Sequence, residues 1–242
     1  SYKDVAKEYV RYRFKRELIR DSEGINNSVL DILNLKNQNI KEENSNKNPV
    51  VLSTQRDYMA GEVSKDLTMR LLLPDDIVKA HKEGIIHFHD ADYFSQKMYN
   101  CCLTNLEDML QNGTVINGTL IERPHSFSTA CNIATQVMAQ IASNQYGGQS
   151  ETLSHLAPFV DVSRQKLRSE IREEFETLLK DKVIEQIPND DVINNLAEKR
   201  LKDEIKRGVQ TIQYQINTLM TSNGQTPFVT IFMYLGEVAE GR

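Results

Sequence analysis

The sequence predicts an α/β fold, because long helical patterns alternate with a few short and strongly apolar runs. Residues 190–220 place apolar side chains at alternating spacings of four and three, which is the pattern of an amphipathic helix. Residues 85–89 and 226–235 are short and apolar, as buried strands are. A chain of 242 residues is long enough for one large domain or two small ones.

The first third of the chain predicts helices separated by a polar loop. Residues 2–20 have the composition of a helix already under way, and the asparagine-rich residues 34–48 predict a loop or linker. Residues 53–72 predict a second helix. A short third helix should follow Pro74, since acidic residues occupy its first turn and Gly84 ends it.

The middle of the chain predicts a helix made of small residues. Residues 101–106 either extend the strand at 85–89 or begin a turn toward the next helix. Residues 128–145 are rich in Ala, Ser and Thr, and Gly147 and Gly148 interrupt them. Such a helix lets another backbone come close, which fits a buried helix or a subunit contact.

The last third predicts two long helices and a strand. Residues 162–186 form a long charged pattern, and residues 190–220 follow it, so that the two helices could pair as a hairpin. They serve as scaffold or as a dimer interface. Asn223 and Gly224 then turn the chain into the strand at 226–235, which would normally have neighbours on both sides. The sequence is therefore expected to be a piece of something longer.

Composition narrows the class of partner. A net charge of −5, from 29 basic and 34 acidic residues, gives no electrostatic reason to bind nucleic acid. No window approaches the ~18 consecutive apolar residues of a membrane span, and nothing resembles a signal peptide. Three cysteines cannot form a full disulfide framework, which favours a reducing cytoplasm. We expect neither a nucleic acid nor a membrane partner.

One candidate site is the group His87, His89 and Asp90. Residues two apart on a strand share a face, so the two histidines should point the same way, and Asp90 could turn into the same cavity. Such a cluster can bind a divalent metal, act as a general acid/base group, or form a core hydrogen-bond network. A metal would need a third and a fourth ligand, for which His81, His125, His155 and unassigned acidic residues are available.

A second candidate is Asn100 with Cys101 and Cys102. Adjacent side chains on an extended segment face opposite ways, so at most one of the two thiols should enter the cavity. The other is expected to be buried as a small apolar residue, as is Cys131. An accessible cysteine beside histidines can be a nucleophile, a metal ligand or a hydrogen-atom donor.

Three motifs in order resemble one known family. They are IIHFHDADY…NCCLTNLEDMLQNGTVING at 85–118, QVMAQIASNQYGGQ at 136–149 and TSNGQTPFVTIF at 221–232. Together they resemble the catalytic subunit of the anaerobic (class III) ribonucleoside-triphosphate reductases, which are glycyl radical enzymes. The resemblance extends from residue 53 onward. It implies the N-terminal half of a ten-stranded α/β barrel, and reduction of ribonucleoside triphosphates to 2′-deoxyribonucleoside triphosphates by radical chemistry without oxygen.

The resemblance also assigns roles to the candidate residues. It makes Cys101 the substrate-facing cysteine that donates hydrogen, with Asn100, His87 and His89 lining the same pocket and Asp90 supporting them. These residues would form a metal-free substrate pocket.

A deoxynucleotide effector site at a dimer interface is implied as well, with Glu122, Gln136 and Lys166 as contributors. A lysine suits a phosphate, since its ammonium is a compact charge. Each of these three residues can equally be an ordinary surface residue.

Cofactors and partners follow from the same resemblance. The family uses a glycyl radical, formate or a thiol reductant, dNTP and ATP effectors, Mg²⁺ with the nucleotide, a structural zinc, and a radical-SAM activating enzyme, and it forms homodimers. The radical glycine, the thiyl cysteine and the zinc cysteines are expected beyond this sequence, so the fragment should not turn over alone. Residues 1–20 could be the tail of the family's ATP cone, and 21–242 the half-barrel.

Two other functions compete with this reading. One is a metal-dependent hydrolase that uses His87, His89 and Asp90. The other is a non-catalytic module for nucleotide binding or dimerisation.

Overall fold

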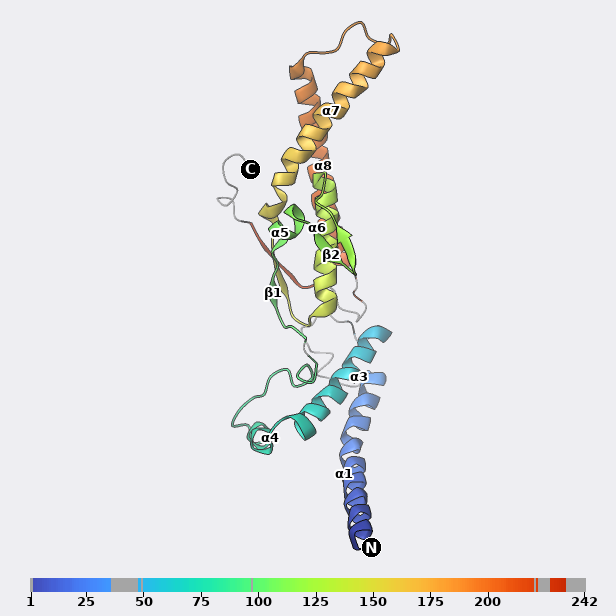
Figure 1. The fold of residues 1–242 in the computed structure, drawn as a ribbon, viewed down its shortest axis with the longest axis vertical. Coiled ribbons are helices and arrows are strands. Elements are labelled where there is room, and N and C mark those ends of the chain that lie inside the picture. The colour runs from blue at the N-terminus through green and yellow to red at the C-terminus, as the bar shows by residue number, and fades with distance from the viewer. Residues whose placement is uncertain are drawn as a thin grey trace. The chain divides into compact units, whose positions relative to one another are not determined.

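The computed structural model describes residues 2–35, 48, 50–96, 98–219, 221 and 227–233, with 13–24 and 26 described by their backbone alone. The described residues fall into two compact units, one up to Met98 and one from Tyr99 onward. Figure 1 shows the elements of both units along the chain. Neither unit, in the part of the chain that is described, has a helix both long and apolar enough to cross a bilayer.

The first unit is helical. It contains α1 (Tyr2–Leu33), α3 (Leu52–Leu67), a π-helical turn at Thr68–Leu72, and α4 (Asp75–Lys82). The helix expected at 2–20 is confirmed and runs further than expected, and the helix expected at 53–72 is confirmed with its last turn wound as π-helix. Most of the loop expected at 34–48 lies outside the described residues.

The strand expected at 85–89 is wrong. The amides of Ile85 and Ile86 donate to the carbonyl of Ala80, at 2.9 and 3.3 Å, and the amide of Phe88 donates to Nδ1 of His81 at 3.1 Å. The segment therefore folds back on the end of α4, and its backbone amides donate hydrogen bonds to α4 instead of to a neighbouring strand. It has the short apolar composition of a strand, but in the described chain no neighbouring strand pairs with it.

The second unit is built on a three-stranded parallel sheet in the order β1-β4-β5. The strands are β1 (Cys102–Leu103), β4 (Gln149–Thr152) and β5 (Val229–Phe232). Parallel strands with helical crossovers confirm the α/β class. Residues 101–106 thus enter the sheet through β1, and within the described residues β5 is shorter than the expected 226–235.

Two small elements between β1 and the next long helix were not expected. A short helix, α5 (Leu106–Gln111), begins at Asn105, whose side chain accepts a hydrogen bond from the amide of Asp108. An antiparallel hairpin follows, formed by β2 (Thr114–Ile116) and β3 (Thr119–Ile121). Asn117 and Gly118 form its turn with positive φ values of 51° and 77°, as an Asn-Gly hairpin turn requires.

Helix α6 (Phe127–Asn144) is the buried helix of this unit, as its small residues predicted. Ala130, Cys131 and Ala134 are fully buried, and α8 (Asp190–Thr218) packs against this face. A Cβ at Gly208 of α8 would lie 2.7 Å from Cε1 of Phe127 and 2.9 Å from Sγ of Cys131. The two helices therefore come this close only because one of them has no side chain there.

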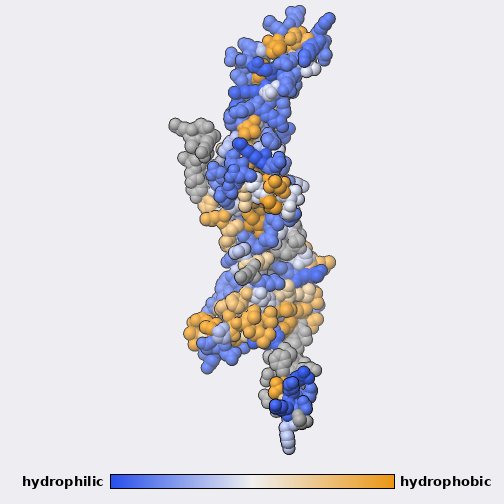
Figure 2. Space-filling model, viewed as in Figure 1, coloured by the Kyte–Doolittle hydropathy of each residue, from blue (hydrophilic) through white to orange (hydrophobic). Residues whose placement is uncertain are grey.

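After β4, the turn at Leu153–Leu156 leads to a helical hairpin of α7 (Pro158–Lys180) and α8 (Asp190–Thr218). The two helices run side by side, as expected for residues 162–186 and 190–220 (Figure 1). Ile171, Ile193 and Ala197 form a buried cluster between them. The outer surface of the hairpin is mostly hydrophilic, with small apolar patches (Figure 2).

Candidate functional site

The candidate residues Asn100 and Cys101 lie where the chain enters β1. Their backbone joins the parallel ladder, since the amide of Gly147 donates to the carbonyl of Asn100 at 2.8 Å and the amide of Cys102 donates to the carbonyl of Gly148 at 3.2 Å. The segment is therefore extended, and its side chains alternate between the two faces of the sheet.

The two neighbouring thiols lie on opposite faces, as the sequence predicted. Cys101 is exposed, like Leu103 two residues later, whose exposed fraction is 82%. Its thiol donates a hydrogen bond to Oδ1 of Asn100 at 3.3 Å. Cys102 is half-buried, and burial raises the pKa of its thiol. Of the two, Cys101 is therefore on the open face of the sheet.

The covered face of the same strands carries buried polar groups. Thr104 donates to Oε1 of Glu151 at 2.6 Å, and Nε2 of Gln149 donates to the carbonyl of Met138 on α6 at 2.8 Å. Glu151 is 0% exposed, and burial raises the pKa of its carboxyl group to about 7. Among the described residues, Oε2 of Glu151 and Oε1 of Gln149 have no hydrogen-bond donor.

The histidine group lies in the first unit, after α4. The rings of His87 and His89 are 5.8 Å apart between centroids, and the ring of His81 is 5.5 Å from that of His87. Nδ1 of His89 lies 2.6 Å from Oδ2 of Asp90, whose φ is +55°. The structure therefore brings His87, His89 and Asp90 together without the expected strand, and it adds His81.

No group of three or more His, Cys, Asp or Glu side chains among the described residues is arranged to hold a metal ion. The histidine group belongs to the first unit, and the pair Asn100 and Cys101 belongs to the second.

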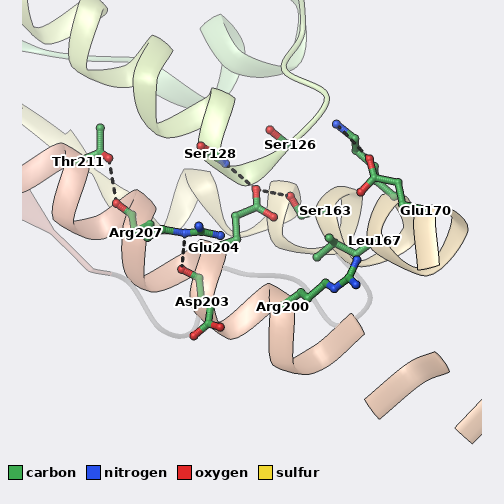
Figure 3. A pocket seen from close by; sticks show the side chains of 11 residues that line it. Ser126, Ser128, Ser163, Leu167, Glu170, Arg200, Asp203, Glu204, Arg207 and Thr211 are labelled. Atoms are coloured by element: carbon green, nitrogen blue, oxygen red, sulfur yellow. Dashed lines mark hydrogen bonds and ion pairs between the residues drawn. The ribbon is translucent and has the colours of Figure 1, made fainter. Parts of the chain in front are cut away.

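Of the expected effector residues, Lys166 lines a pocket of about 560 Å³ between the start of α6 and the α7–α8 hairpin. Figure 3 shows how its side chains lie. Its charged lining residues are Lys166, Glu170, Arg200, Asp203, Glu204 and Arg207. Glu122, after β3, and Gln136, on α6, are exposed and are not among the lining residues. The structure therefore does not bring the three residues into one pocket.

Two charged side chains that line this pocket already have hydrogen-bond partners within the fold. Oε1 of Glu204 accepts hydrogen bonds from the amide of Ser128 and the hydroxyl of Ser163, both at 2.9 Å, so it caps the N-terminus of α6 (Figure 3). Arg200 makes two hydrogen bonds to Glu174, at 2.8 and 2.9 Å, which lower the pKa of that carboxyl group. Nζ of Lys166 is 3.8 Å from Glu170, a loose contact between exposed groups that leaves the ammonium available.

Comparison with known proteins places the chain in a family. Residues 43–242 match the sequence family described as anaerobic ribonucleoside-triphosphate reductase. This chain belongs to that family. It is 38% identical over 245 residues to the anaerobic ribonucleoside-triphosphate reductases of Salmonella typhimurium and Escherichia coli, in matches that cover 100% of this chain. The reductase of enterobacteria phage T4 is 38% identical over 208 residues, or 86% of this chain.

The chain spans about a third of the length of these reductases, 32% in each case. A crystal structure of the anaerobic ribonucleotide reductase from Thermotoga maritima, in complex with dATP and CTP, is similar in fold. The TM-score is 0.54 at 16% sequence identity, and the match covers 84% of this chain and 30% of that one. The sequence match is to anaerobic ribonucleoside-triphosphate reductases, and this structure of similar fold is also an anaerobic ribonucleotide reductase.

Sequence reasoning about this reductase segment missed the polar residues around β4. Gly147 donates to the carbonyl of Asn100, Gln145 donates to the carbonyls of Gly147 and Gly148, and Glu151 accepts from Thr104. None of these roles was predicted. The run Gln149–Thr152 is polar, and a strand was sought only in apolar runs. The available signal was the pair Gly147 and Gly148 directly before it, which marks a close backbone approach.

Proposed function

We propose that this chain is part of an enzyme that reduces ribonucleoside triphosphates to 2′-deoxyribonucleoside triphosphates by radical chemistry in the absence of oxygen. The observation that carries the proposal is the 38% identity, over the whole chain, to proteins named for this activity. The rest of the catalytic machinery, including the radical glycine and the thiyl cysteine, would lie in the remaining length of the longer protein.

The second unit would contribute strands to the family's ten-stranded barrel. Its parallel sheet has α6 on one face, and residues such as Cys101 and Leu103 are exposed on the other. An exposed face on a parallel sheet is unusual, because parallel sheets normally have both faces covered. In the proposed barrel, this face would line the interior.

Cys101 is the proposed hydrogen donor during reduction. In the family's chemistry, the radical supplies a thiyl that removes hydrogen from C3′ of the ribose, and the 2′-hydroxyl leaves as water. Cys101 would then donate a hydrogen atom from its thiol to the 2′ carbon, and formate or a thiol would supply the electrons that quench the sulfur radical this leaves. Asn100, whose Oδ1 accepts from that thiol at 3.3 Å, would orient the sulfur and the ribose hydroxyls.

His87 and His89 are proposed to line the substrate pocket, with Asp90 holding His89. Support comes from the 2.6 Å contact between Asp90 and Nδ1 of His89, which fixes the orientation of that ring. Both imidazoles are exposed, and imidazole nitrogens can hydrogen-bond a polar substrate.

Lys166 is the best supported of the proposed effector residues. It lines a pocket large enough for a nucleotide, together with Arg200 and Arg207 and with the acidic residues Glu170, Asp203 and Glu204. Glu122 and Gln136 would join this site only through a second subunit or a rearrangement. The family implies nucleotide effectors in general, and we propose a dNTP here.

The remaining parts of the proposal follow from the family. The intact protein would be a cytoplasmic homodimer, activated by a radical-SAM enzyme and supplied with electrons by formate or a thiol. Mg²⁺ would accompany the nucleotide, and a structural zinc would lie outside this sequence. The three free cysteines agree with a reducing compartment.

The catalytic proposal is tested by exchanging each of the neighbouring cysteines in the full-length, radical-bearing protein. Cys101→Ser should abolish deoxynucleotide formation, because a serine hydroxyl is a poor hydrogen-atom donor. Cys102→Ser is the matched control, since the half-buried Cys102 faces α6, and it should retain most activity. Full activity in Cys101→Ser would refute the role of this thiol.

The effector proposal is tested by calorimetry with dATP, dTTP and dGTP. Lys166→Ala should weaken binding of the effector nucleotide at least about tenfold, the effect of losing ~1.4 kcal/mol of binding free energy. Lys202→Ala removes another exposed lysine, which lies on α8 and is not among the residues that line the pocket, and it should leave binding unchanged. Equal affinities for both variants would contradict the assignment.

A further inference from the structure

The turn at Tyr146–Gly148 lies directly against Asn100. The amide of Gly147 donates to the carbonyl of Asn100 at 2.8 Å, and the side-chain amide of Gln145 donates to the carbonyls of Gly147 and Gly148 at 3.2 and 2.8 Å. Gln145 is itself buried, so these hydrogen bonds are shielded from water. The turn is therefore held on both sides, by Asn100 and by Gln145.

Gly147 has no room for a side chain. A Cβ there would lie 2.8 Å from the carbonyl carbon of Asn100, and closer still to the carbonyl and side-chain oxygens of the same residue. Real Cβ atoms do not approach other atoms so closely. The obstacle includes backbone, which cannot swing aside as the end of a long side chain can.

Backbone conformation is not the reason for this glycine. The glycines with positive φ in the described chain are Gly84, Gly113 and Gly118, so Gly147 has a backbone that an L-residue can adopt. An alanine at 147 could adopt the backbone φ of this position, but its Cβ would clash with Asn100. The restriction is specific to the contact with the Asn100–Cys101 segment.

We infer that Gly147 is a positioning residue, which sets where Asn100 and Cys101 stand on the open face of the sheet. An alanine would push the Asn100 carbonyl away, break the hydrogen bond between Gly147 and Asn100, and shift the thiol of the next residue. Misplacing a reacting group by about 1 Å can lower a rate about a hundredfold. This inference rests on the proposed function.

The test compares Gly147→Ala with Gly61→Ala in the full-length, radical-bearing protein. Gly61 lies on α3, where a Cβ would have its nearest neighbours at an ordinary 3.7 Å. Gly147→Ala should lower kcat for deoxynucleotide formation about a hundredfold, change KM less than about threefold, and leave effector affinity unchanged. Gly61→Ala should match the wild type in all three measurements.

The outcomes separate this inference from the proposed function. If the wild type forms no deoxynucleotide, the proposed function is wrong, and the inference about Gly147 falls with it. If the wild type is active and Gly147→Ala keeps its kcat, only the inference is overturned. The same holds if the fall in kcat is matched by an equal rise in KM and an equal fall in effector affinity. Should Gly147→Ala not fold, Gln145→Met decides, since it removes the side-chain amide that holds the turn and keeps a side chain of similar length. The same selective loss of kcat is expected there, and an unchanged kcat overturns the inference.

Discussion

The buried carboxyl group of Glu151 makes the stability of the second unit depend on pH. Its Oε1 accepts from Thr104, its Oε2 has no donor among the described residues, and the nearby Gln149 Oε1 has none either. Replacing Glu151 by glutamine keeps the shape and the acceptor for Thr104. Glutamine also brings an NH₂ donor close to Oε1 of Gln149, an acceptor that has no donor among the described residues.

The magnitude follows from the raised pKa. Burial raises the pKa of Glu151 from 4.5 to about 7, so the folded state keeps a proton that the unfolded chain releases between these values. Each pKa unit corresponds to about 1.36 kcal/mol, which gives a loss of roughly 3 kcal/mol of stability. Stability is full below the unfolded pKa of 4.5, falls progressively as the pH rises from there, and the loss is complete once the pH has passed the folded pKa of about 7. Glutamine does not titrate, so Glu151→Gln should not show this loss.

Urea unfolding of the chain followed by circular dichroism, from about pH 5 to about pH 8.5, measures the effect. The wild type should lose roughly 2–3 kcal/mol more than Glu151→Gln over this range, and the two curves should diverge chiefly between about pH 5 and about pH 7 and run parallel above that. Glu176→Gln, an exposed substitution on α7, is the matched control and should follow the wild type. Parallel pH profiles for wild type and Glu151→Gln would refute the reasoning.

Three further substitutions probe the packing of the second unit. Gly208→Ala should destabilise by about 1–3 kcal/mol in urea unfolding, because its Cβ would collide with Phe127 and Cys131; a neutral effect would mean that α6 and α8 can separate freely. Phe159→Ala, at a fully buried position, should cost about 3–5 kcal/mol, and a loss below about 1 kcal/mol would show that the core collapses around it. Glu174→Gln should cost no more than about 1 kcal/mol, since its pair with Arg200 is exposed, and that cost should shrink as salt is added.

The long helices could be predicted because their signals are local. Apolar spacing along 190–220, the proline before α4 and the small residues of α6 each lie within one element. The bounds shifted where contacts decide them. The charge pattern suggested a helix over 162–186, but α7 starts at Pro158 and ends at Lys180. Two residues after its end, Lys182 has a φ of +58°, which a helix cannot contain.

The strands could not be predicted as well, since pairing partners decide them. Residues 85–89 are apolar but donate their backbone hydrogen bonds to α4, while the polar residues of β4 form the central strand. A buried Glu151 is tolerated there because Thr104 donates to it and its pKa rises, and neither fact is visible in one strand alone.

The sequence by itself determined the α/β class, the helical hairpin and the resemblance to the family, and it named the candidate site residues. It also determined that Cys101 and Cys102 must face opposite ways, because that alternation is a property of any extended backbone. Only the tertiary structure decided which thiol is exposed, since the answer depends on which face α6 covers. It also decided that Gly147 must lack a side chain, because the atom it would strike belongs to a residue 47 positions earlier in the chain, brought close only by the parallel pairing of β1 and β4.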